Sequence, residues 1–179
     1  MKVKHCAAAL TALAILGSSS ARAEETPRFQ VDPFWPKPLP NNWIFGEIGG
    51  VAVDRHDHVW VLQRPRSLKD DEKAAALTPP MSKCCMPAPP VLEFDPAGNL
   101  LQSWGGPGSG FEWPQREHGI FVDARDHVWI GGNEKDDHQI LEFTKDGKFV
   151  KQIGEARRTE GSNSTRFLGR PALAIVDES

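Results

Sequence analysis

The chain of 179 residues carries 21 basic and 24 acidic residues, which gives a formal net charge of −3. A negatively charged chain has no electrostatic reason to bind nucleic acid or an anionic membrane surface, so neither class of partner is expected. Apart from the N-terminal segment, no run is apolar enough to cross a membrane, for which about 20 residues are needed.

Residues 1–23 have the pattern of a secretory signal peptide. Two lysines form a positive region, residues 7–16 form an apolar core, and residues 21–23 (Ala-Arg-Ala) form a small-x-small cleavage site before Glu24. The apolar core is shorter than the roughly 20 residues that span a bilayer. We therefore expect an exported protein, periplasmic or extracellular, which keeps 18 basic residues against 24 acidic ones.

Residues 24–41 form a proline-rich lead-in. Proline removes the backbone donor that a sheet needs, so this segment is expected to be extended and not to form a central strand. Phe29, Phe34 and Trp35 are expected to pack the lead-in onto the first repeat.

The next part of the chain repeats itself. Residues 50–61 return as 119–130 at an offset of 69, and residues 91–105 return as 140–154 at an offset of 49. Each copy has four short apolar runs separated by polar turns, which is typical of antiparallel meanders. Four strands in about 40–45 residues is the size of a β-propeller blade. A β-sandwich could use similar strands, but it would not require two units to share their residues.

We therefore predict an all-β fold over residues 42–179, made of β-propeller blades of four antiparallel strands each. Blade one is expected at about 48–106, blade two at about 117–155, and the start of a third blade at about 169–179. Propellers use about 4–8 blades, so these units cannot close a ring by themselves. The expected partner is the rest of a longer propeller; the alternative is a unit that closes the ring by oligomerising.

The first repeat contains an insertion of 20 extra residues within 66–90, with a short helix expected at 69–77. Such insertions project from one face of a propeller, commonly the binding face, although an ornamental loop is an equal alternative. The insertion carries Cys84 and Cys85. Adjacent cysteines cannot join distant strands, and two of them are too few for structural zinc, so we expect a local loop feature whose redox state stays open.

Some conspicuous residues have a structural interpretation. Trp60 and Trp129 are repeat equivalents and are expected to pack between blades. His58 and His127 are also equivalents, beside acidic turn residues, and are expected to be solvated. The glycine-rich stretch 104–110 lacks the Gly-Lys-Ser/Thr ending of a phosphate-binding loop and is expected to connect the blades.

Three further residues are candidates for function. His118 lies immediately before the first strand of blade two, expected at about 119–123. First strands line the channel of a propeller, where His118 could be one of the roughly three protein ligands of a catalytic zinc. Arg64 ends the second strand of blade one and could clamp a carboxylate, although it could equally be a surface arginine. His138 ends a loop just before a strand and is a weaker candidate.

Together these residues resemble the NHL-repeat six-bladed β-propellers and, within them, the peptidyl-α-hydroxyglycine α-amidating lyase (peptidylamidoglycolate lyase) group. The resemblance covers nearly all of 42–177, roughly the N-terminal half of such a propeller. The segments that carry it are 50–54 with Arg64, His118-Gly119-Ile120, His138-Gln139-Ile140, 161–162 and 169–172.

The resemblance implies an axial zinc held by three histidines, of which His118 matches the first. It also implies a structural calcium held partly by the backbone carbonyls of Val51 and Ile120, and a catalytic role for Arg64 in cleaving a hydroxyglycine to an amidated peptide and glyoxylate. The other zinc histidines, a tyrosine and the remaining calcium ligand would lie beyond Ser179, and this chain has no tyrosine. The chain alone is therefore expected to be inactive. The alternative function is a non-catalytic propeller that binds a peptide, a small molecule or a protein.

Overall fold

The computed structural model describes residues 26, 28–161, 163–164 and 168–171. The expected signal peptide at 1–23 and residues 172–179 of the expected third blade lie outside this part. The chain divides into two compact units, Met1–Asp32 and Pro33–Ser179, and every strand belongs to the second. Within the described residues, no helix is long and apolar enough to pass through a bilayer.

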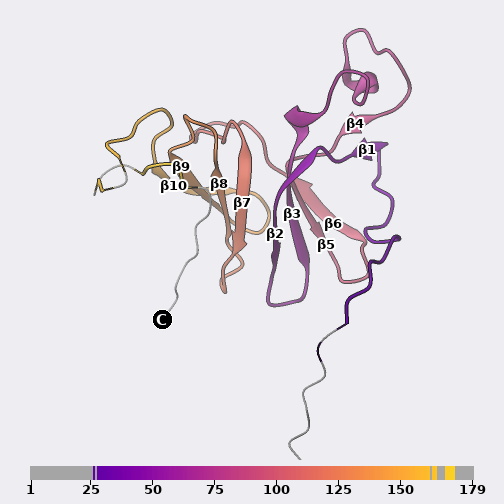
Figure 1. The fold of residues 1–179 in the computed structure, drawn as a ribbon, viewed down its shortest axis with the longest axis horizontal. Helices are drawn as coiled ribbons and strands as arrows, with labels where there is room; N and C mark the ends of the chain where they lie inside the picture. The colour runs from indigo at the N-terminus through magenta and orange to yellow at the C-terminus, as the bar shows by residue number, and fades with distance from the viewer. Residues whose placement is uncertain (1–25, 27, 162, 165–167, 172–179) are drawn as a thin grey trace, which may run out of the picture. The chain divides into compact units, whose positions relative to one another are not determined.

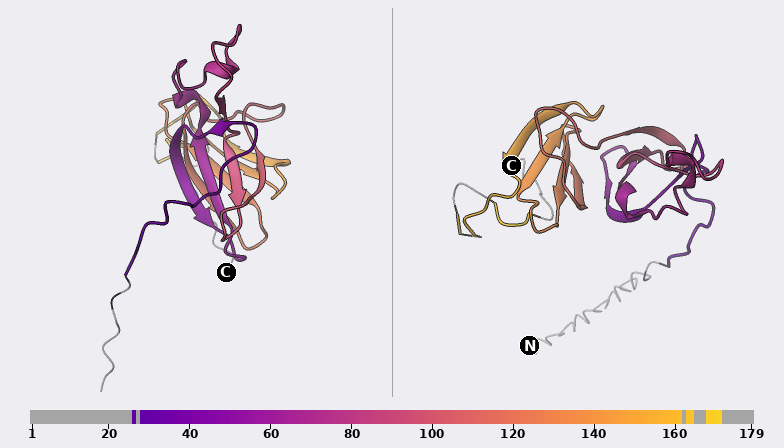
Figure 2. Two further views of the ribbon diagram at one scale, coloured as in Figure 1. Left: turned by 90° about the vertical axis from the view of Figure 1, so that its right-hand side faces the viewer. Right: turned by 90° about the horizontal axis from the view of Figure 1, so that it is seen from above.

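Two four-stranded antiparallel sheets form most of the second unit (Figures 1 and 2). The first sheet has the order β2-β3-β5-β6 and comprises β2 (Glu47–Val53), β3 (Val59–Arg64), β5 (Val91–Phe94) and β6 (Leu100–Trp104). The second has the order β10-β9-β8-β7 and comprises β7 (Glu117–Val122), β8 (Val128–Gly132), β9 (Gln139–Phe143) and β10 (Phe149–Gly154). The predicted all-β fold with four-stranded antiparallel blades is confirmed.

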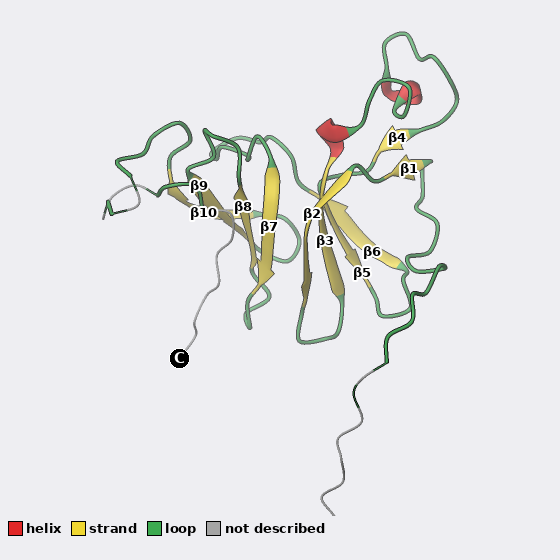
Figure 3. Ribbon diagram, in the orientation of Figure 1, coloured by secondary structure: helices red, strands yellow, loops and turns green. Residues whose placement is uncertain are grey.

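The insertion extends beyond the end of the sheet at which β3 ends (Figures 1 and 3). It contains two single-turn 3₁₀ helices, η1 (Pro65–Ser67) and η2 (Ala74–Ala76), and the strand β4 (Met86–Pro87), which pairs in parallel with β1 (Trp43–Ile44). The helix expected at 69–77 is therefore wrong, apart from its last turn. Helix nucleation is unfavourable in free energy, and a short helix offsets it only when tertiary packing stabilises the helix along its length.

The main core lies between the two blades. It consists of Trp60, Leu62, Val91, Trp113, Ile120, Val122, Val128, Ile130, Leu141 and Phe143. Trp60 is fully buried there, as expected for a residue that packs between blades. Trp129 lies between two core residues of β8, so strand alternation turns it to the opposite face of blade two, where the Lys151 ammonium lies 4.9 Å from its ring centre.

A second core covers the other face of blade one. Val61, Leu92 and Phe94 pack there against the lead-in, and the Trp35 ring lies 5.6 Å from that of Phe94. Trp35 therefore packs as expected, whereas Phe34 is 76% exposed and does not pack as expected. Phe29 belongs to the first unit, so its expected packing stays a prediction. The blade-two equivalents of Val61, Leu92 and Phe94 belong to the core between the blades. The lead-in thus occupies the place on blade one that a neighbouring blade occupies elsewhere.

The first strands of the two blades, β2 and β7, lie side by side (Figure 1). Two glycines of β2 make this possible. A Cβ on Gly49 would come 2.6 Å from the Glu117 carbonyl oxygen, and one on Gly50 would come 2.9 Å from that of His118. Since these obstacles are backbone atoms, a larger residue could be accepted only by moving one strand away from the other.

We expect Gly50→Ala to destabilise the protein by about 1–3 kcal/mol, because the added methyl group forces β2 away from β7. Urea unfolding followed by tryptophan fluorescence would measure the change. Gly169→Ala is the matched control, since a Cβ at Gly169 meets no atom within 4 Å among the residues that the structure describes. Equal unfolding midpoints for the two variants would show that the strands do not depend on this close approach.

Candidate functional site

The structure brings together two candidates that lie on different blades. Arg64 ends β3 of blade one, and His118 lies on β7 of blade two in a β-bulge, where neither Gly131 nor Gly132 of β8 pairs with it. Blade one has an equivalent bulge at Gly49. Bulges re-aim the side chain of the extra residue. The extra residue of blade one is Gly49, which has no side chain. The strand β7 can therefore lie close to β2 at this point.

Arg64 is held by three acceptors. Its Nε donates to the Glu117 carbonyl oxygen at 2.6 Å, one terminal nitrogen donates to Glu47 Oε2 at 2.8 Å, and the other lies 3.3 Å from His118 Nδ1. A guanidinium only donates, so His118 Nδ1 must accept. The proton of the neutral His118 ring is therefore on Nε2, which is a hydrogen-bond donor.

A hollow of about 200 Å³ lies next to Arg64, and His118 is not among the residues that line it. The charged residues that line it are Glu47, Arg64, Arg66, Arg116, Glu117 and Glu134. Two of these glutamates fix arginines, because Glu47 pairs with Arg64 and Glu117 Oε1 lies 3.2 Å from Arg66. Three guanidinium groups at one small hollow can bind a carboxylate, the anion for which the planar arginine fork is best suited.

His118 as placed does not fit a zinc ligand. Zinc binds a ring nitrogen that carries no proton, and here Nδ1 is engaged by Arg64 while Nε2 holds the proton. The groups of histidines and carboxylates that could hold a metal ion among the described residues do not include His118. Zinc at His118 therefore stays a prediction, and it requires Arg64 to leave Nδ1.

The calcium expectation also stays a prediction. Val51 on β2 and Ile120 on β7 lie on adjacent strands, with Val51 58% exposed and Ile120 4% exposed. Calcium takes about 6–8 oxygen ligands, and two backbone carbonyls supply only a small part of that number. The two side-chain groups whose spacing could hold a metal ion among the described residues contain neither Val51 nor Ile120.

The remaining candidates lie apart from the Arg64–His118 pair. His138 is buried, and its Nε2 lies 2.6 Å from the Lys135 carbonyl oxygen, so the ring helps to fix the loop before β9. Cys84 and Cys85 form a disulfide with each other in the exposed insertion, which is a local loop feature. Neither contact involves Arg64 or His118.

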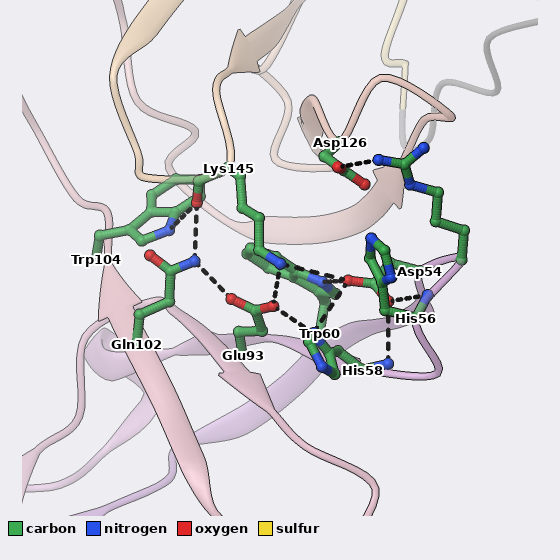
Figure 4. Close-up of polar contacts among 10 residues, drawn as sticks. Asp54, His56, His58, Trp60, Glu93, Gln102, Trp104, Asp126 and Lys145 are labelled. Atoms are coloured by element: carbon green, nitrogen blue, oxygen red, sulfur yellow. Dashed lines mark hydrogen bonds and ion pairs between the residues drawn. The ribbon is translucent and has the colours of Figure 1, made fainter.

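Sequence reasoning missed a polar cluster in blade one (Figure 4). Asp54 accepts hydrogen bonds from the backbone N–H of His56 and His58 and from the Trp60 indole at 3.1 Å. His58 Nδ1 lies 2.8 Å from Glu93 Oε1. The expectation that His58 is a solvated turn residue is therefore wrong, because it joins two buried carboxylates.

Blade two repeats the cluster with Asp123, His127, Trp129 and Glu142, where His127 Nδ1 lies 2.6 Å from Glu142 Oε1. The expectation for His127 is wrong for the same reason. The signal in the sequence was the recurrence itself, since the acid, the histidine and the tryptophan return at the same offset.

The blade-one cluster joins the blades. Lys145, in the turn between β9 and β10 of blade two, places its ammonium 2.8 Å from Glu93 Oε1 (Figure 4). Arg55 makes a second connection to Asp126 of blade two at 2.8 Å. The Asp54, His58 and Glu93 side chains could hold a metal ion by their spacing, but the lysine already supplies a cation there. We therefore interpret the cluster as a set of ion pairs and hydrogen bonds that holds the two blades together.

No family model matches this chain, and no curated protein matches it. The site is thus described by its own geometry.

Asp54 gives a pH-dependent prediction. Burial raises the pKa of its carboxyl, but the hydrogen bonds from Trp60, His56 and His58 outweigh burial and hold the pKa below its ordinary value. The carboxylate therefore stabilises the fold above the unfolded-state pKa of about 3.9 and loses this effect as the pH falls through the lower folded-state pKa.

We expect Asp54→Asn to lower the stability at pH 7 by about 1–3 kcal/mol, because buried donors lose their charged acceptor. The difference from the unchanged protein should shrink below about pH 4. Melting temperatures measured from pH 7 down to pH 3 would test this, with exposed Asp71→Asn as the control. A pH-independent difference would contradict the role of the ionised carboxylate.

Proposed function

We propose that this chain is part of an exported β-propeller that binds a carboxylate-bearing ligand, a peptide or a small molecule, where Arg64 and His118 meet. The observation that carries the proposal is the 3.3 Å approach of the Arg64 guanidinium to the His118 ring across two blades, beside a hollow with three arginines. Arg64 is only 12% exposed and pairs with Glu47, but the N–H that faces His118 Nδ1 meets a neutral acceptor and can donate to an anion instead.

Each residue has a distinct part in such binding. A ligand carboxylate can take the Arg64 N–H that now reaches His118 Nδ1, because a carboxylate is a stronger acceptor than a neutral ring nitrogen. His118 can donate its Nε2 proton to a second polar group of the ligand. Glu47 and the Glu117 carbonyl keep the guanidinium oriented throughout.

A lyase similar to the peptidyl-α-hydroxyglycine amidating enzymes is the second candidate. It is favoured by one observation: the residues that the resemblance assigns to catalysis and to zinc, Arg64 and His118, lie in contact although 54 positions separate them in the sequence. The substrate of such an enzyme also presents a carboxylate. The two candidates differ in whether His118 holds a metal.

Binding of N-acetylglycine, compared with its neutral analogue N-acetylglycinamide, tests the main proposal. We expect the acid to bind and the amide to bind at least tenfold more weakly, since a charge-assisted hydrogen bond contributes about 1.5–3 kcal/mol. Arg64→Gln should remove the preference for the acid, whereas Arg28→Gln, a change of an exposed arginine in the lead-in, should keep it. Isothermal titration calorimetry would measure both ligands. Equal affinities for acid and amide in the unchanged protein would refute the proposal.

Metal analysis separates the two candidates. If the carboxylate-binding proposal is right, the purified chain dialysed against zinc should hold the same amount of zinc before and after His118→Ala, measured by atomic absorption. Stoichiometric zinc that is lost in His118→Ala, together with glyoxylate release from a hydroxyglycine peptide, would favour the lyase.

A further inference from the structure

A second and larger hollow, of about 430 Å³, lies between the insertion, the connector after β6 and the start of β7. Its walls are mainly apolar and include Trp43, Pro65, Pro87, Pro89, Pro90 and Pro107. Arg66 and Glu117 line this hollow as well as the smaller one beside Arg64, so the two share a wall. Its volume is in the range of about 300–1,000 Å³ that is usual for small-molecule sites.

The walls of this hollow are firmly held. The strand β4 pairs with β1 and so fixes Pro87 next to the segment of Trp43. Gln63, which is fully buried, donates from Nε2 to the carbonyl oxygens of Ala88 at 2.6 Å and Pro89 at 3.1 Å. Its backbone N–H donates to the Pro90 carbonyl oxygen. A site on such fixed segments is preorganised and spends little free energy on ordering when a ligand binds.

Glu117 is the acidic residue that lines the hollow. The proline walls offer it no backbone donors, because proline has no N–H. Glu117 is 2% exposed, and its Oε1 accepts from the Trp113 indole at 2.8 Å and from Arg66. Its Oε2 is buried and has no hydrogen-bond partner among the residues that the structure describes. A buried carboxylate oxygen without a donor is costly, so this atom favours a ligand that donates.

We propose that this hollow binds a small apolar amine. The apolar body lies against Trp43 and the prolines, and the ammonium group donates to Glu117 Oε2. Trp43 adds a cation–π surface for the positive charge. The Arg66 guanidinium also donates to the carbonyl oxygens of Pro114 and Gln115 at 2.7 Å each, so it stays in place, and the ammonium group binds Oε2, the carboxylate oxygen of Glu117 that Arg66 does not contact. The ligand has the opposite charge to that proposed for the Arg64–His118 site, so charge distinguishes the two ligands although Arg66 and Glu117 line both hollows.

Phenethylamine and phenylacetate are suitable probes, because they have similar aromatic bodies and opposite charges. The readout is the indole N–H signals of the ¹⁵N-labelled chain, assigned through single tryptophan substitutions. We expect phenethylamine at millimolar concentrations to shift the Trp113 and Trp43 signals until they saturate. Phenylacetate should bind at least tenfold more weakly at this place.

Two variants identify the groups responsible. Glu117→Gln should abolish the preference for the amine, and Glu72→Gln, which changes an exposed glutamate in the insertion, should keep it. Trp43→Ala should weaken phenethylamine binding while the remaining indole signals keep their positions, which shows that the fold is intact. The proposal is overturned if phenethylamine causes no saturable shift, if it shifts only other tryptophans, or if the acid binds as well as the amine. N-acetylglycine, titrated into the same samples, reports separately on the Arg64–His118 site.

Discussion

The approach of β2 to β7 is the constraint on which the rest of the second unit depends. Two glycines of β2 allow the backbones of neighbouring blades to come together, and the large aromatic core fills the space behind them. The same approach lets Arg64 reach the Glu117 carbonyl and the His118 ring. At the opposite end of the strands, Lys145 and Arg55 tie the turns of the two blades together. Packing and the candidate site thus rely on one geometric relation.

The two blades use different side chains to accept a hydrogen bond from the backbone N–H that precedes the first strand. The backbone N–H of Gly46 and that of Gln115 are repeat equivalents, and both lie just before a first strand. The Gly46 N–H donates to the Gln63 amide oxygen at 2.8 Å. The Gln115 N–H donates to the Asp137 carboxylate at 2.7 Å. Buried backbone donors must be paired, but the repeat does not prescribe the partner. Because Gln63 also holds the prolines of the insertion, this divergence helps to fix the walls of the larger hollow next to blade one.

Much of the fold could be predicted because the repeat encodes it directly. Recurring apolar runs and turns indicated the blades and their strands. The expected packing between blades is confirmed for Trp60, whereas Trp129 lies on the opposite face of blade two. The histidines were misjudged because exposure depends on side chains from distant strands. For His58 the decisive residue is Glu93, which lies 35 positions away. The pairing of Arg64 with His118 could not be predicted either, since it follows from a bulge that shifts one residue out of register.

The lead-in determines on which side of blade one another sheet can pack. On blade one it covers the face formed by Val61, Leu92 and Phe94, and the equivalent face of blade two is the one that packs against blade one. Stacking of such sheets is therefore blocked on one side of blade one and can proceed only from blade two. In any ring built from these blades, the last sheet would meet Trp35 and Leu39 of the lead-in in place of bare strands. The seam of the ring would then be a joint between a sheet and an irregular segment, and it would be the natural place for the ring to open.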